Sequence, residues 1–167
     1  WTNYQRMAGD PDLIAAVRHS VLLTAMFVPA SIVLGVLVAV ALNQRIRLIG
    51  FYRTCIFVPF VASAATTGII SSYVFNPQFG AINDGLRHLG LPAQQFLESP
   101  SQALPTVRVV ALWGSIGFTA VVYLAALQDV PRELIEAATV DGASAWQAFR
   151  SVTVPHLRPV TLFVAVW

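Results

Sequence analysis

Long stretches without charged residues alternate with short polar segments along this chain. Two stretches of more than twenty residues, Val21 to Gln44 and Thr54 to Asn83, contain no Asp, Glu, Lys or Arg, and a shorter one runs from Val109 to Gln128. A fourth apolar run begins at Val160. A helix needs roughly 20 residues to cross a hydrocarbon core of about 30 Å. The pattern therefore predicts membrane spans at about 20–42, 54–75, 107–127 and 160–167 onward.

Proline and glycine indicate where the predicted spans bend or end. Pro29 lies inside the first span and predicts a bend, because neighbouring membrane helices can compensate for the lost backbone hydrogen bond. Asn76-Pro77 is a turn signal that closes the second span. The segment 78–105 contains glycine or proline at six positions. We expect it to be an extramembrane connection with a short helix at Ala81–Leu89.

The composition agrees with a membrane protein. Apolar residues make up 56% of the chain, charged residues make up 11%, and the mean hydropathy is +0.68. Soluble domains have roughly a quarter charged residues. The chain begins at Trp1 without a signal-peptide pattern, and the fourth apolar run ends without a flanking charge. We expect a single all-α polytopic membrane domain, 1–167, truncated at both ends.

Arginine residues predict the orientation of this domain. Six of the ten arginines fall in two connections that are two crossings apart and therefore lie on the same side. They are Arg45, Arg47, Arg53, Arg132, Arg150 and Arg158. The positive-inside rule places both connections in the cytoplasm.

Several other functions lack the residues that they require. The net charge of +2, without any Lys, argues against nucleic-acid binding. Cys55 is the only cysteine, and the three histidines have no metal-ligand spacing. No charged residue lies in the middle of a span, which argues against a proton relay. We therefore expect no catalytic residue and no metal site. No GxxxxGK[ST] phosphate loop is present either, so any ATP hydrolysis is expected on a separate subunit.

The polar segment 128–158 predicts two short helices that are joined by a tight turn. Pro131 suits a first helical turn and Asp129 suits its cap, so the first helix is expected at Arg132–Val140. Gly142 is placed to leave this helix in the left-handed conformation.

The second helix of this segment is predicted by a capping box. Ser144 is followed three residues later by Gln147, so a helix is expected from about Ala145 to Val152, stopping before Pro155. Its apolar face would carry Trp146, Phe149 and Val152, which a partner protein can bury in a groove. His156 is expected to be an interfacial residue.

The same segment contains a spaced motif. It reads Glu136-Ala137-Ala138, three residues, Gly142, nine residues, then Val152-Thr153-Val154-Pro155. This resembles the cytoplasmic EAA loop of permease subunits in binding-protein-dependent ABC importers, whose pattern ends in Ile-x-Leu-Pro. Asp141, Arg158-Pro159 and Asn76-Pro77-Gln78-Phe79-Gly80 look like the carbohydrate-uptake branch, similar to maltose, glycerol-3-phosphate and trehalose permeases.

The resemblance implies a fold, an activity and partners. The fold is a helical bundle, here a fragment of a six-span permease of the plasma membrane, and the activity is ATP-driven import of a carbohydrate or related polar solute. The partners are ATP-binding cassette subunits, which bind ATP and Mg in place of any cofactor of this chain, a second homologous permease, an extracytoplasmic solute-binding protein and membrane lipid. The residues implied in coupling to the ATPase are Glu136, Ala137, Ala138, Asp141, Gly142, Val152, Val154 and Pro155.

Hydroxyl groups recur every four residues on two predicted spans and suggest a solute path. They are Ser63, Thr67 and Ser71 on the second span, and Ser115, Thr119 and Tyr123 on the third. Each set lines one helical face. They are candidates for a path that a polar solute follows, but the interpretation we favour is helix packing through small and hydroxyl residues.

Two alternatives to carbohydrate import follow from the same sequence. One is a permease of the same superfamily that carries a polyamine, a phosphate ester or an amino acid. The other is a membrane scaffold or enzyme in which segment 128–158 is only an interfacial connector.

Overall fold

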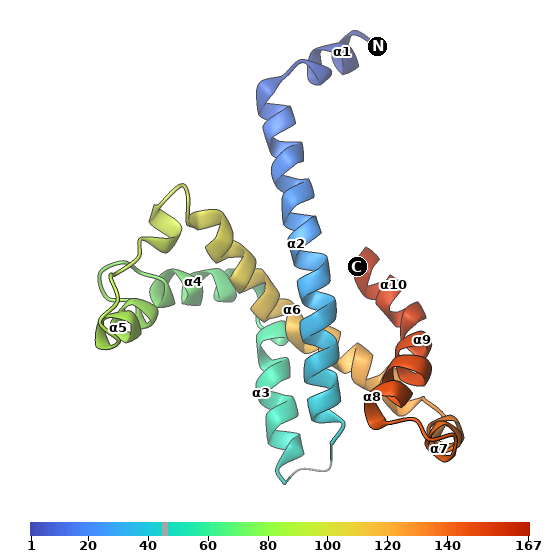
Figure 1. The fold of residues 1–167 in the computed structure, drawn as a ribbon. Helices are drawn as coiled ribbons and strands as arrows, with labels where there is room; N and C mark the ends of the chain where they lie inside the picture. Colours follow the sequence, from blue (N-terminus) through green and yellow to red (C-terminus); the bar gives the residue numbers. More distant parts are fainter. Residues whose placement is uncertain (45–46) are drawn as a thin grey trace.

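The computed structural model describes residues 1–44 and 47–167, which form helices and no strand (Figure 1). Arg45, one of the arginines that predict the orientation, lies outside the described residues. The helices are α1 (Thr2–Ala8), α2 (Pro11–Leu42), α3 (Ile49–Val61), α4 (Ala64–Val74), α5 (Ala81–His88), a 3₁₀ turn (Phe96–Glu98), α6 (Ala103–Gln128), α7 (Arg132–Val140), α8 (Ala145–Ala148), a π turn (Phe149–Thr153), α9 (Val154–His156) and α10 (Arg158–Val166). The predicted all-α fold is confirmed.

Two of the described helices, α2 with 32 residues and α6 with 26, are long and apolar enough to cross a membrane. They contain the predicted first and third spans. Helix α2 begins before the predicted span because Asp10 caps it, its Oδ1 accepting the Asp12 N–H at 3.0 Å, and Pro11 occupies its first turn. The helix continues through Pro29.

The predicted second span, 54–75, is not one helix. Helices α3 and α4 are bent by 102° at a short break, so that α4 turns away from α2 in Figure 1. Ala62 and Ser63 have extended backbone there, and Ser63 Oγ accepts the Thr66 N–H at 3.2 Å. An N-cap serine begins a new helix, which is why the apolar run divides at this point.

The connection after α4 is a compact hydrogen-bonded unit. Asn76 Oδ1 accepts the N–H groups of Gln78 and Phe79 at 2.9 and 3.2 Å, which confirms the predicted turn. The fully buried Asn83 donates to the Gln94 carbonyl and accepts the Gln94 N–H, both at 2.8 Å. Helix α5 confirms the short helix that the sequence predicts at Ala81–Leu89.

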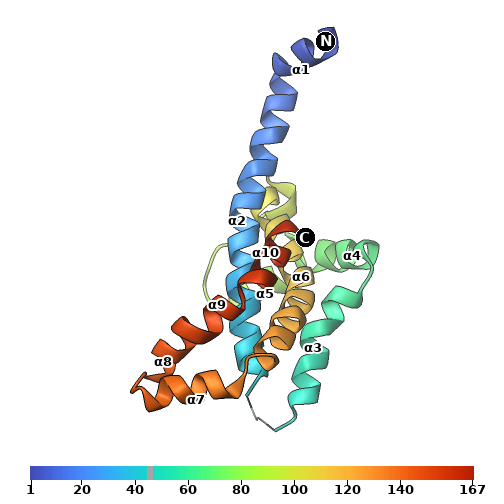
Figure 2. The ribbon, with the colours of Figure 1, turned by 90° about the vertical axis from the view of Figure 1, so that its right-hand side faces the viewer.

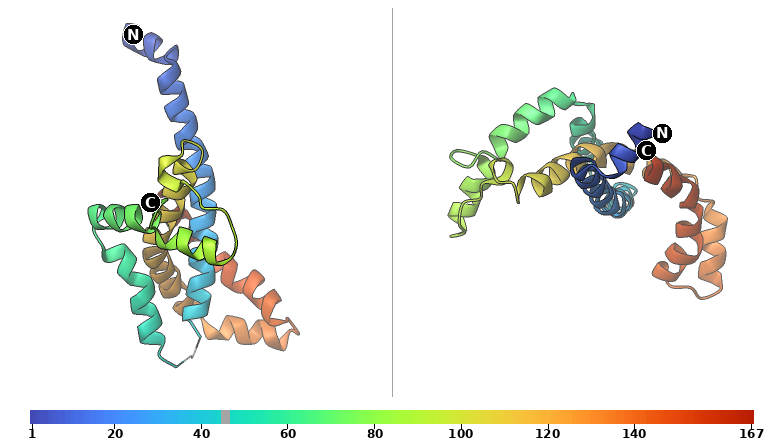
Figure 3. Two further views of the ribbon diagram at one scale, coloured as in Figure 1. Left: turned by 90° about the vertical axis from the view of Figure 1, so that its left-hand side faces the viewer. Right: turned by 90° about the horizontal axis from the view of Figure 1, so that it is seen from above.

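The buried core lies where α2, α6, α9 and α10 meet. Its residues are Ala39, Leu42, Tyr123, Leu124, Leu157 and Val164. Glycine allows the close approaches around it: a Cβ on Gly35 would collide with the Thr119 side chain, and one on Gly117 would lie 2.6 Å from the Ile56 carbonyl oxygen. Helices α3 to α5 extend from α2 on one side and α7 to α10 on the other (Figure 3).

Candidate functional site

Segment 128–158 projects from one end of the bundle as two short helices, α7 and α8 (Figure 2). The bounds predicted for the first helix are confirmed. Asp129, however, is not its cap: the N-cap residue is Pro131, whose carbonyl accepts the Leu134 N–H at 3.2 Å. Asp129 instead directly follows the last residue of α6. The prediction therefore assigned it to the wrong helix.

The turn after α7 is a complete Schellman motif. Gly142 has φ +83°, and its N–H donates to the Thr139 carbonyl at 3.0 Å. The Ala143 N–H donates to the Ala138 carbonyl at 2.9 Å. These are the two bonds that end a helix when the next residue is left-handed. The predicted conformation of Gly142 is confirmed, and Ala138 of the EAA motif contributes its backbone to the turn.

The predicted capping box begins α8. Ser144 Oγ accepts the Gln147 N–H at 3.3 Å, and Gln147 Oε1 accepts the Ser144 N–H at 2.7 Å. Because both bonds lie directly after the turn, they fix the direction in which α8 leaves it.

The sequence predicts that the second helix stops before Pro155, but the helical backbone continues past this residue. After Ala148 it widens into a π turn over Phe149–Thr153, in which the Val154 N–H donates to the Phe149 carbonyl, and it continues as α9. Pro155 lies in the first turn of α9, where a backbone donor is not needed. The looser π winding thus lets the chain pass through the proline.

Large apolar side chains are exposed on the surface of this loop among its polar residues. Trp146 is 68% exposed and stacks on Phe149, with ring centroids 5.7 Å apart, and Val140 is 86% exposed. Phe149 and Val152 are half-buried. A groove of about 610 Å³ runs over the turn, with lining residues that include Gly142, Trp146, Gln147 and Arg150. The sequence indicated Trp146, whereas Gln147 and Arg150 were missed as groove residues because the groove exists only in the folded turn.

The motif residues differ in their exposure. Glu136, Ala137, Asp141, Val154 and Pro155 are exposed, and Ala138 and Val152 are half-buried. The residues that hold the second helix in place are the buried Ala148, Thr153 and Leu157. The exposed members are therefore free to contact another protein.

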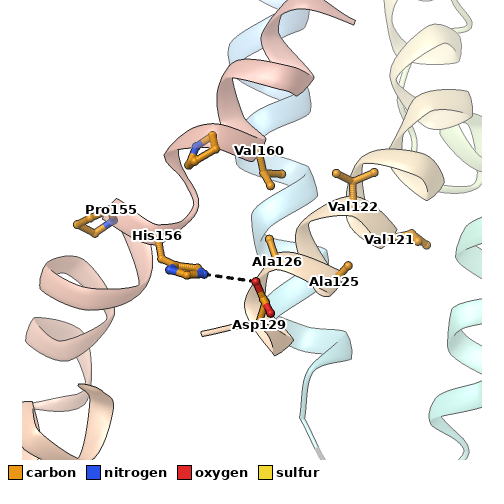
Figure 4. A pocket seen from close by; sticks show the side chains of 9 residues that line it. Val121, Val122, Ala125, Ala126, Asp129, Pro155, His156 and Val160 are labelled. Atoms are coloured by element: carbon orange, nitrogen blue, oxygen red, sulfur yellow. Dashed lines mark ion pairs between the residues drawn. The ribbon is translucent and has the colours of Figure 1, made fainter. Parts of the chain in front are cut away.

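The base of the loop encloses a pocket of about 980 Å³ between α6 on one side and α9 and α10 on the other (Figure 4). Its walls are apolar, with Val122 and Ala126 facing Val160. At its rim, His156 Nε2 lies 3.9 Å from Asp129 Oδ2. This contact links the last turn of α6 to α9.

The six candidate path residues do not form one surface. Ser115 and Thr119 line a cavity of about 400 Å³ between α2, α6 and α10. Ser63, Thr67 and Ser71 lie on or before α4, outside this lining, and the Tyr123 hydroxyl bonds to Thr161 at 3.0 Å. Spacing along the sequence placed each set on a face but did not show which helix each face meets.

A residue that the sequence did not single out completes this cavity. Ser31 of α2 lines it, is 4% exposed, and its Oγ has no hydrogen-bond partner among the described residues. A buried hydroxyl without a partner is costly and therefore available to a polar group that enters the cavity. The described residues contain no group of three or more His, Cys, Asp or Glu that could hold a metal ion.

Comparison with protein families gives one extended match. The family described as binding-protein-dependent transport system inner membrane component matches residues 31–167. Similar curated proteins include a diacetylchitobiose uptake system permease of Streptomyces coelicolor, 37% identical over 93% of this chain and 48% of that protein. A lactose transport system permease of Rhizobium radiobacter is 32% identical over 98% of this chain and 56% of that protein. The chain thus spans about half the length of these relatives.

Solved structures agree on the fold. The chain superposes on a chain of a bacterial ABC transporter involved in the import of the acidic polysaccharide alginate, with a TM-score of 0.88 and 24% identity over 99% of this chain and 59% of that one. A second crystal structure, of a bacterial alginate ABC transporter in complex with an alginate pentasaccharide-bound periplasmic protein, gives a TM-score of 0.85 and 24% identity, over 95% of this chain and 56% of that one.

Proposed function

The chain belongs to the family of inner membrane components of binding-protein-dependent transport systems, and we propose that it forms part of the solute path of an ATP-driven carbohydrate importer. The observation that carries this proposal is the rigid turn at Gly142, which presents exposed apolar side chains on a loop between membrane helices. The solutes named for the relatives, diacetylchitobiose and lactose, support a carbohydrate.

The loop of α7 and α8 is the proposed contact with an ATP-binding subunit, which would supply ATP and Mg²⁺. Trp146 and Val140 offer apolar area to a groove in that subunit, and the exposed carboxylate of Glu136 offers a charge to a basic partner. Because Gly142 and the capping box fix α7 and α8 relative to each other, a push on either helix moves both. This proposal places the loop in the cytoplasm.

The cavity between α2, α6 and α10 is the proposed part of the path that this chain supplies. Ser31, Ser115 and Thr119 place three hydroxyl groups around it. The protons of Ser115 and Thr119 go to backbone carbonyls, but their oxygens can still accept from a neutral, hydroxyl-rich solute, and Ser31 can both donate and accept. A second permease would complete the path, with a solute-binding protein outside the membrane and lipid around it. The complex of an alginate transporter with its periplasmic protein supports the solute-binding protein as a partner.

Reconstitution of the full-length protein tests the proposal. The protein would be purified together with the ATP-binding subunit and second permease encoded beside it, and placed in liposomes with the cognate binding protein. Uptake of radiolabelled lactose, diacetylchitobiose, spermidine and glutamine would be compared with and without internal ATP and Mg²⁺. We expect ATP-dependent uptake of a sugar.

Each other outcome of this experiment has a defined meaning. Uptake of spermidine or glutamine alone would replace the carbohydrate by another solute of the same superfamily. Failure of the ATP-binding subunit to purify with the permease would overturn the coupling role and favour a scaffold or enzyme.

A further inference from the structure

Two hydroxyl groups join the helix that enters the loop to the helix that leaves it. Oη of Tyr123 on α6 lies 3.0 Å from Oγ1 of Thr161 on α10. Thr161 Oγ1 donates its own proton to the Leu157 carbonyl at 2.9 Å, so Tyr123 is the donor of the interhelical bond. Within residues 1–44 and 47–167, this is the one hydrogen bond that connects α6 with α10.

Tyr123 is held in one position by its surroundings. Its side chain is fully buried and belongs to the core cluster around Ala39 and Leu157. On the α2 side the fit is so close that a Cβ on Gly35 would lie 3.2 Å from the Tyr123 ring. The ring cannot move without displacing α2 or α6, so its hydroxyl is a fixed point to which α10 is attached.

The bond lies between two hollow regions. On the loop side, the pocket of about 980 Å³ separates α6 from Pro159 and Val160 (Figure 4). On the other side lies the cavity of about 400 Å³, which is lined by Ser115 and Thr119 of α6 and by Val164 of α10. The Tyr123–Thr161 bond therefore joins α6 and α10 within the buried core, between these two hollows.

The other contacts between these helices are apolar: Val164 belongs to the core cluster with Tyr123 and Leu124, and aromatic rings meet beyond it. The Phe118 ring lies against Phe163 and Trp167, with centroids 6.3 and 4.5 Å apart. Aromatic pairs are favourable in several offset and edge-to-face arrangements, whereas a hydrogen bond weakens steeply when its angle changes. The hydroxyl pair is thus the directional part of the attachment.

From this placement we infer that Tyr123 and Thr161 are positioning residues that clamp α6 to α10, so that motion of the loop between them moves both helices together. The inference rests on the proposed coupling function of the loop. Helix α10 is connected to α8 through the π turn and α9, a stretch in which Pro155 and Pro159 cannot donate backbone hydrogen bonds. Without the clamp, a push on α8 is absorbed in this segment instead of reaching α10.

A labelling experiment on the full-length protein with its ATP-binding subunit measures this transmission. The exposed Cys55 is replaced by serine, and Ala165, which lines the cavity from α10, is replaced by cysteine as a reporter. The rate of its reaction with methanethiosulfonate ethyltrimethylammonium is measured without nucleotide and with ATP, Mg²⁺ and vanadate. The ratio of the two rates is the response.

Three variants isolate the hydroxyl bond from the shape of the side chains. Tyr123→Phe and Thr161→Val each delete one hydroxyl and keep the volume, whereas Thr161→Ser keeps the hydroxyl and serves as the control. We expect either deletion to reduce the response by about threefold and at most about twentyfold, the range of interhelical hydrogen bonds in membrane proteins. The double variant should respond like either single variant, because all of them remove the Tyr123–Thr161 bond. Tyr123→Phe removes this bond alone, whereas Thr161→Val also removes the bond to the Leu157 carbonyl within α10.

The remaining outcomes separate failure of the clamp from failure of the proposed function. Three outcomes would overturn the clamp. The first is an equal response in the background and in both deletions, and the second is losses that add in the double variant. The third is a loss in Thr161→Ser equal to that in the deletions. Gly142→Val is measured alongside: if it abolishes the response while the deletions do not, only the clamp is wrong. If Gly142→Val leaves the response unchanged, the coupling role of the loop is wrong and the clamp falls with it. Should Tyr123→Phe fail to assemble, Thr161→Val tests the same bond.

Discussion

Gly142→Val is expected to weaken binding of the ATP-binding subunit, whereas Gly142→Asn should leave it nearly unchanged. Gly142 has φ +83°, a conformation that costs most L-residues about 1–2 kcal/mol and costs a β-branched residue such as valine most. Asparagine tolerates this conformation because its side chain can hydrogen-bond to the nearby backbone. The two side chains are similar in size, so the comparison isolates the backbone.

The structure excludes a steric explanation within this chain. No heavy atom lies within 4 Å of the position that a Cβ on Gly142 would occupy. The cost is therefore the strain of the turn, or the loss of its two bonds to Thr139 and Ala138 if the chain relaxes. A cost of about 1–2 kcal/mol changes an equilibrium by roughly 5- to 30-fold, so we expect the Kd to rise by about tenfold for valine and by less than about twofold for asparagine.

Interferometry on immobilised ATP-binding subunit, with the full-length permease in nanodiscs, measures both Kd values. Equal recovery of each variant by size exclusion serves as the control for insertion, since no membrane helix is altered. Wild-type affinity in the valine variant would refute the role of the turn. An equal loss in the asparagine variant would place the effect in a collision with the partner and not in the backbone.

Three further changes test other parts of the structure. Ser144→Ala removes the capping box and should raise the same Kd by about fivefold, since a cap contributes about 1 kcal/mol. Deleting Ser151 should convert the π turn to an α turn and rotate α8 by about 100° relative to α10. We expect this variant to hydrolyse ATP without uptake of solute, whereas Ser151→Ala should transport normally. In Gly117→Ala the added Cβ would meet the α3 backbone, so the free energy of unfolding in detergent should fall by about 1–3 kcal/mol. In Gly114→Ala the Cβ faces open space, and the free energy of unfolding should stay unchanged.

The turn and its helices could be predicted because their determinants are local. The left-handed conformation of Gly142 and the bonds of Ser144 with Gln147 depend on residues within five positions of each other. Such short-range preferences are the same in a membrane loop as in a soluble protein. Local chemistry does not indicate a family. The spacing of the EAA motif did so through its resemblance to ABC importer permeases, and the family match to residues 31–167 confirms this resemblance.

Sequence reasoning failed where a helix break lay inside an apolar run and where the partner of a side chain was distant in the sequence. Ser63 was counted as one hydroxyl of a continuous face, yet it caps α4, because the apolar run hides the helix break. Tyr123 and Thr119 do share a face, since both side chains lie against Gly35, but the spacing did not show that the Tyr123 hydroxyl pairs with Thr161, 38 residues away. Asp129 was assigned to the following helix although it approaches His156. Periodicity identifies a face of a helix and does not identify what the face touches.

The division of the second span changes how the orientation is argued but not the result. If α3 and α4 were counted as two crossings, parity would place the loop opposite to the end of α2. In the fold, however, α4 turns aside, and α6 returns the chain to the end of the bundle where α2 stops, so α7 and α8 project from that same end (Figures 1 and 2). There Arg53 donates to the Leu42 carbonyl at 3.2 Å. Arg47 and Arg53 follow the end of α2, and three further arginines belong to segment 128–158, which projects from the same end of the bundle. The positive-inside rule therefore supports placing that end in the cytoplasm without any count of crossings.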